Sequence, residues 1–157
     1  MHTDFERFLL DAEDHFLQGS EMADFKQHVS SLAQRLETYE LLRDQEPKIW
    51  QPIADQLAQS GESPQKQEKA LEHWIAALRY GAMAMLLNDP AFLQYRLLEW
   101  LTDIVQAHQL VDLEHQLSQL LEARLKDILS AQQWALMQPY LTQTHQILVG
   151  TALVTAA

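Results

Sequence analysis

The chain has 157 residues, of which 47% are hydrophobic and only four are glycine, so it can bury a core and is not of the disordered class. Its 22 acidic and 11 basic side chains give a formal net charge of −11. Phosphate binding needs clustered Lys and Arg, which are missing here, so we expect no nucleic acid partner and no anionic membrane surface. No Cys is present, which excludes disulfides, Cys-ligated metals, thiol nucleophiles and thioether-linked cofactors.

The same sequence gives expectations for location and fold class. The N-terminal residues are charged throughout, unlike a signal peptide, so we expect a cytoplasmic protein. The longest nearly continuous apolar run, over residues 76–87, is shorter than the roughly 20 residues of a membrane span, and no membrane insertion is expected. Few β-branched residues and no alternating stretch predict an all-α protein. We expect one helical domain over residues 1–150, followed by a short tail at 151–157.

Two helices are predicted first, from Asp4 to about Leu17 and from Ser20, as the capping residue, to about Asp44. The first is too short to be stable alone, so it should dock on its own domain or on another subunit. Apolar residues of the second alternate spacings of three and four, and we expect them to pack in the core of a helix bundle. They are Met22, Phe25, Val29, Leu32, Leu36 and Tyr39.

A short helix with Pro47 in its first turn precedes a central helix that Ser63 caps and Asn88-Asp89-Pro90 ends. Apolar residues of the central helix recur at spacings of three and four, and its second half is apolar nearly all round. This pattern predicts a helix with neighbours on several sides. The recurring residues are Leu71, Trp74, Leu78, Ala82 and Met85.

Three more helices are predicted, from about Phe92 to His108, from a cap at Asp112 to about Leu129, and from a Ser130–Gln133 capping box to about Val149. Pro139 should break or kink the last one. Seven or eight helices joined by short loops suit either a globin-like pack of crossed helices or an elongated bundle. The residues expected to face inward in the first of the three are Phe92, Leu93, Leu97, Trp100, Leu101, Ile104 and Val105.

The central helix carries Leu78-Arg79-Tyr80, followed by an apolar run and Asn88-Asp89. This stretch resembles the phycobiliprotein α and β subunits of the phycobilisome, where C-x-R-D is followed four residues later by L-R-Y and then by G-D. The resemblance is diffuse over about 4–128 and sharpest over 70–101. Further matching positions are Leu93, Arg96, Leu98 and Leu101, the segments 15–17 and 21–22, and Arg35. The resemblance implies a globin-like, crossed-helix fold with an extra N-terminal helix.

Three departures from the family pattern concern the pigment. Ala70 stands at the bilin-attachment Cys, Glu72 at the Arg that pairs with a propionate, and His73 at the Asp that hydrogen-bonds the pyrrole nitrogens. The first change removes the covalent bond, and the second replaces attraction for a carboxylate by repulsion. The resemblance therefore implies a bilin-free, non-catalytic binding or scaffold protein of phycobilisome or photosystem assembly, regulation or turnover, in a cyanobacterium-like cytoplasm.

The family also implies pairing of subunits through N-terminal helices, so we expect a homodimer formed by Phe5, Phe8 and Leu9, or contact with a phycobilisome or photosystem subunit. The competing interpretation is that these residues fold back on their own chain. A second class of function is a haem or free-tetrapyrrole carrier or sensor, with a pocket at His73, Arg79 and Tyr80. The ordinary interpretation of His73 is a partly exposed polar residue.

A metal-dependent enzyme ranks lowest among the functions considered. Asp112-x-x-His115 occurs once, where a di-metal carboxylate bundle needs paired motifs, and no glycine-rich phosphate loop is present. We therefore predict no catalytic residue, no metal ligand and no bound cofactor.

Overall fold

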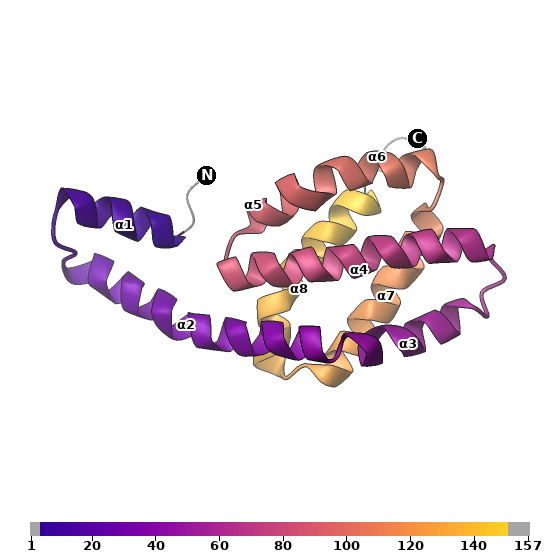
Figure 1. Ribbon diagram of the computed structural model, residues 1–157, viewed down its shortest axis with the longest axis horizontal. Coiled ribbons are helices and arrows are strands. Elements are labelled where there is room, and N and C mark those ends of the chain that lie inside the picture. Colours follow the sequence, from indigo (N-terminus) through magenta and orange to yellow (C-terminus); the bar gives the residue numbers. More distant parts are fainter. Residues whose placement is uncertain (1–3, 151–157) are drawn as a thin grey trace.

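The computed structural model describes residues 4–150, with side chains from residue 6 onward. This part of the chain consists of helices joined by short turns and loops, and it contains no strand. In Figure 1, α7 and α8 run across α4 rather than along it, so the prediction of an all-α, globin-like fold of crossed helices is confirmed. The helices are α1 (Asp4–Asp14), α2 (Gly19–Asp44), α3 (Glu46–Leu57), α4 (Pro64–Leu87), α5 (Pro90–Leu93), the π-helical η1 (Gln94–Leu98), α6 (Glu99–Ala107), α7 (Val111–Ile128) and α8 (Ala131–Leu148).

Helix α4 is the centre of the core, as its apolar pattern predicts. Trp74, Leu78 and Met85 are buried, and the helix packs against α2, α5, α7 and α8. Gly81 allows the close approach of α8, since an added Cβ would lie 2.9 Å from Met137 Cε. The body of the protein is therefore built around one apolar helix with neighbours on several sides.

Most predicted helix ends are confirmed, and two predicted caps are wrong. The Ser63 hydroxyl accepts from the Lys66 N–H, and the Ser130 hydroxyl accepts from the Gln133 N–H. Asn88 ends α4 in the left-handed region at φ 53°. Ser20 and Asp112 are not caps, because α2 begins after Gln18 and α7 begins after Leu110, which places both residues inside the first turn.

The segment after Pro90 differs from the single regular helix that was predicted. Residues 94–98 form the π-helix η1, whose wider turn shifts the side chains that follow relative to a regular helix. Leu93, Leu97, Leu101 and Val105 are buried at a spacing of four, and Leu98 is buried beside them. Trp100, predicted to face inward, is 50% exposed, and its indole N–H donates to the Arg96 carbonyl at 2.8 Å.

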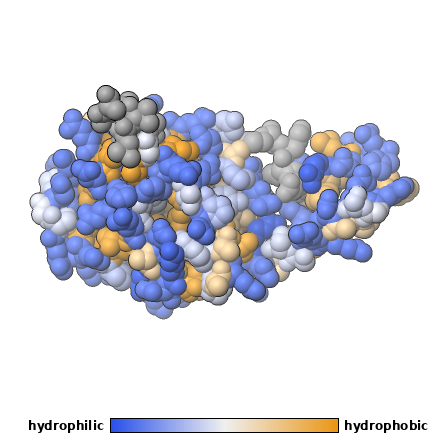
Figure 2. All heavy atoms as spheres, turned by 180° about the vertical axis from the view of Figure 1, so that it is seen from behind, coloured by the Kyte–Doolittle hydropathy of each residue, from blue (hydrophilic) through white to orange (hydrophobic). Residues whose placement is uncertain are grey.

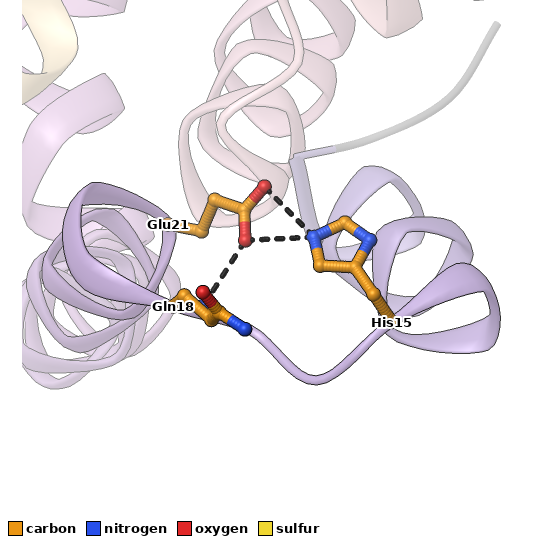
Figure 3. A network of polar contacts seen from close by, with 3 residues as sticks. All are labelled: His15, Gln18 and Glu21. Atoms are coloured by element: carbon orange, nitrogen blue, oxygen red, sulfur yellow. Dashed lines mark hydrogen bonds and ion pairs between the residues drawn. The ribbon is translucent and has the colours of Figure 1, made fainter.

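The first helix and the start of α2 form an arm that stands out from the body, visible as the indigo and violet hairpin of Figure 1. Phe8 is buried against α2, where its ring meets Phe25 edge-on at 5.5 Å between ring centres. Figure 3 shows the turn between the helices, where His15 Nε2 lies 3.0 Å from Glu21 Oε2 and the Gln18 N–H donates to the same carboxylate. The pKa of Glu21 is lowered from its ordinary value, mainly by the hydrogen bond from the Gln18 backbone and next by the one with His15.

The predicted core packing of the α2 seam is wrong for most of its residues. Met22, Val29, Leu32 and Leu36 are exposed, and the buried residues of α2 are Arg35, Thr38 and Leu42. The reason is geometric, since only the last part of α2 lies against the body. There Arg35 Nη1 donates to the Leu86 carbonyl at 2.5 Å, which ties α2 to the end of α4.

Candidate functional site

A buried ion pair joins α4 to α7 at the first of the predicted site residues. His73 Nδ1 lies 2.6 Å from Glu114 Oε1, and Glu114 is fully buried. Burial raises the pKa of Glu114, while the hydrogen bond with His73 acts in the opposite direction. The second carboxylate oxygen and the Trp74 indole nitrogen make no hydrogen bond to the described residues. The prediction of His73 missed this partner, which lies 41 residues away in the sequence.

Arg79 lies in a different environment. It forms a two-pronged ion pair with Glu46 of α3, in which Nε donates to Oε2 at 2.9 Å and Nη2 donates to Oε1. The hydrogen bond from Arg79 is the main reason why the pKa of Glu46 is lowered. Both residues line a cavity of about 530 Å³ between α2, α3 and α4, together with Tyr39, Leu42 and Met83.

Tyr80 points to a third neighbour, Phe92 of α5, with 6.1 Å between ring centres. His73 thus contacts α7, Arg79 contacts α3 and Tyr80 contacts α5. Of the three, only Arg79 lines the cavity between α2, α3 and α4. A common tetrapyrrole pocket at these three residues stays a prediction.

The residues at the bilin positions of the resembled family do not suit a covalently bound bilin. Ala70 has no nucleophilic atom and is fully buried in the core. Glu72 is exposed and carries a charge of the same sign as a propionate. The Nδ1 atom of His73 is already engaged by Glu114. Each of the three positions lacks the group that would attach, pair with or orient the pigment.

A second cavity, of about 250 Å³, lies between α4, α7 and α8. His115 and His145 line it with 5.3 Å between their ring centres, and His145 Nδ1 lies 2.9 Å from the Ser118 hydroxyl. Burial, and next the nearby His115, lower the pKa of His145. The pairing of α7 with α8 brings the two imidazoles together across 30 residues of sequence.

The arm carries the largest group of exposed apolar side chains. We define the arm face as Val29, Leu32 and Leu36, which lie on one side of α2 and are 43–47% exposed. Figure 2 shows the arm standing out from the body, with hydrophobic residues among the hydrophilic ones on its surface. Of the predicted interface residues, Leu9 is exposed and Phe8 is folded back onto α2; the side chain of Phe5 lies outside the described residues.

Between residues 4 and 150, no three or more His, Asp or Glu side chains are grouped so that they could hold a metal ion. Within the same range, no helix has the length and apolar character needed to span a membrane.

Comparison with known protein families identifies the family of this chain. The family model described as "Phycobilisome protein" matches residues 9–148 of the chain, which include the arm from Leu9 onward and the whole body. A search of curated proteins found no match.

Proposed function

Because this chain belongs to the phycobilisome protein family, we propose that it is a non-catalytic binding or scaffold protein that carries no covalently attached bilin. It acts in the cytoplasm, in the assembly, regulation or turnover of the phycobilisome or a photosystem. The absence of Cys and the residues at positions 70, 72 and 73 support the bilin-free part of the proposal. The working parts are then helix surfaces rather than a reacting centre.

The observation that carries the proposal is the arm face. A monomeric protein gains nothing from placing three large aliphatic side chains on one exposed side of a protruding helix, and contiguous exposed apolar surface marks sites of association. Met83 and Leu87 of α4 are also exposed, and α4 packs against α2. Apolar side chains of the arm and of the neighbouring part of the body are thus available to one partner.

We propose that this partner is a second copy of the chain. A two-fold symmetric dimer brings the same patch of each copy together, which an apolar face satisfies without any need for opposite charge. The net charge of −11 on each copy opposes association through the polar surface, so the apolar arm face is the favoured contact. Leu9 on α1 belongs to the same arm and adds exposed apolar surface.

The test is the mass of the full chain in solution by light scattering, with and without two charges on the arm face. We expect a dimer for the unaltered chain and a monomer for the Leu32→Glu, Leu36→Glu variant. Gln27→Glu with Gln34→Glu is the matched control, since it adds the same charge at exposed positions of the same helix. A monomeric unaltered chain that binds a purified phycobilisome or photosystem subunit through the arm face would replace the second copy by that subunit; a monomer that binds neither overturns the proposal.

The alternative function, carrying haem or a free tetrapyrrole next to His73, is tested by the absorption spectrum of the protein purified from its native host. The proposal predicts only the near-ultraviolet absorption of the four Trp and four Tyr residues. A Soret or red band that is lost in His73→Ala, but kept in the exposed-site variant His108→Ala, would establish the alternative instead.

A further inference from the structure

The cavity between α4, α7 and α8 contains two imidazoles that the proposed function does not use. His115 belongs to α7 and His145 to α8, and their rings are tilted by 59° with 5.3 Å between centres. We propose that His115 and His145 form a two-imidazole site for a divalent first-row transition-metal ion of the Zn²⁺ type. Imidazole nitrogen is a preferred ligand of these ions.

The separation of the rings fits one shared ion. A zinc ion bound at about 2.0–2.1 Å from an imidazole nitrogen lies about 3.2 Å from the centre of that ring. Two such rings at a tetrahedral angle of about 109° have centres about 5.2 Å apart. The 5.3 Å observed between His115 and His145 is close to that value, so the separation of the two rings is compatible with one shared ion.

The hydrogen bonds around His145 leave a free nitrogen for the ion. The Ser118 hydroxyl donates to the His115 carbonyl at 2.8 Å, so its oxygen accepts from His145 Nδ1–H at 2.9 Å. This assignment places the lone pair on His145 Nε2, which makes no hydrogen bond to the described residues. A second partner that fixes the tautomer of a histidine is the usual companion of a metal ligand.

His115 has a comparable partner. Its Nε2 lies 3.0 Å from the side-chain amide nitrogen of Gln119, one helical turn further along α7. An amide nitrogen only donates, so in this orientation His115 Nε2 accepts and Nδ1 carries the proton. Turning the amide by 180° presents its oxygen, which accepts from Nε2–H and leaves the lone pair on Nδ1. In that orientation each imidazole has one nitrogen held by a neighbour and one nitrogen available to an ion.

The cavity supplies the rest of the coordination sphere. Its volume of about 250 Å³ leaves room for the ion and several waters, and the carboxylate of Glu122 lies on the same wall. The Glu122 carboxylate accepts a hydrogen bond from Lys126 Nζ at 2.6 Å. Two protein ligands and two waters complete a tetrahedral site, which is more open than the closed four-ligand sites of structural zinc.

The experiment uses the full chain without a polyhistidine tag, freed of metal with a chelator and titrated with Zn²⁺ in a calorimeter. We expect one equivalent to bind and to raise the unfolding temperature, since an ion that binds only the folded state stabilises it. His115→Ala and His145→Ala each lose that binding and the rise, and Ser118→Ala weakens binding by about tenfold. His108→Ala removes an exposed histidine elsewhere and leaves binding unchanged.

Two outcomes overturn the site. One is that the unaltered chain binds no Zn²⁺, and the other is that His115→Ala and His145→Ala bind it as the unaltered chain does. Circular dichroism of each variant confirms that it is folded, and a folded His145→Ala chain is the decisive sample. Because none of these residues is on the arm, zinc binding and dimerisation are lost by different substitutions, and failure of one proposal leaves the other intact.

Discussion

The arm and the body carry the same sequence pattern with opposite results. In α4, Trp74, Leu78 and Met85 follow one another at spacings of four and seven and are at most 2% exposed, whereas in α2, Val29, Leu32 and Leu36 at spacings of three and four are 43–47% exposed. Both patterns correctly predict a helix with one apolar side. The difference shows that apolar spacing predicts which side of a helix is apolar. It does not predict whether that side packs against its own chain.

The boundary between the two regions lies close to Arg35. Thr38 and Leu42, which follow it, are buried, whereas all three residues of the arm face, the last of which is Leu36, are exposed. Arg35 itself is buried and donates to the Leu86 carbonyl of α4, to the His28 carbonyl and to the Ser31 hydroxyl. A charged residue on a helix thus marks the point where α2 meets the body.

Truncation of matched leucines should show the largest difference between the regions. Leu121→Ala removes a fully buried side chain of α7 and should lower the free energy of unfolding by about 2–5 kcal/mol. Leu32→Ala, on the arm face, should change that of the monomer by no more than about 0.5 kcal/mol. Chemical denaturation of dilute protein measures both. A large loss for Leu32→Ala at concentrations where the chain is monomeric would mean that the arm face is covered by its own chain.

Substitution of Arg35 should separate the arm from the body. Arg35→Met roughly keeps the length of the side chain and removes its hydrogen bonds, including the one to the Leu86 carbonyl. The free energy of unfolding should fall by about 1–3 kcal/mol, because a buried acceptor loses its donor. Hydrogen exchange should accelerate in α1 and the first half of α2 while α7 and α8 stay protected. Uniform acceleration over all helices would show instead that the arm and the body unfold as one unit.

The buried carboxylate of the body gives a pH dependence that the arm lacks. The pKa of Glu114 is raised in the folded chain, so the folded state binds its proton more tightly than the unfolded state does. Stability should therefore fall as pH rises from the ordinary Glu pKa of 4.5 through the raised value, and level off above it. Glu114→Gln keeps an acceptor for His73 Nδ1–H and should remove that fall. An unchanged pH profile in this variant would assign the fall to another group.

Glu21 of the arm provides the opposite case for the same experiment. Its pKa is lowered by the Gln18 N–H and by His15, so the stability it contributes is present above its ordinary pKa and is lost as pH falls through the lowered value. The group is fully exposed to solvent, which screens the effect. Glu21→Gln should therefore slightly change the dependence of stability on pH below the ordinary Glu pKa. Glu114→Gln should change it above that pKa.

The elements of the fold were largely predictable because local rules set them. The Ser63 and Ser130 caps and the end of the central helix at Asn88-Asp89-Pro90 depend on residues a few positions apart, and each is confirmed. The π-turn at 94–98 was missed because its residues also fit a regular helix. The burial of Glu114 and the meeting of His115 with His145 depend on contacts between helices. Neither could be inferred from spacing along one helix.

The N-termini of α2 in the arm and of α8 in the body allow the comparison with the smallest expected effects. At α8, Ser130→Ala removes a cap that accepts from the Gln133 N–H at 3.2 Å, and the free energy of unfolding should fall by about 1 kcal/mol. At α2, His15→Ala removes only an exposed contact with Glu21, and solvent screening makes the expected loss of stability small. Because Glu21 keeps the Gln18 N–H, α2 still has its start, so His15→Ala should leave global denaturation unchanged. It should instead raise the rate of hydrogen exchange at the α1–α2 turn alone.

If His15→Ala lowered the free energy of unfolding as much as Ser130→Ala does, the arm would contribute to global stability as much as the body does. The two regions would then be one cooperative unit.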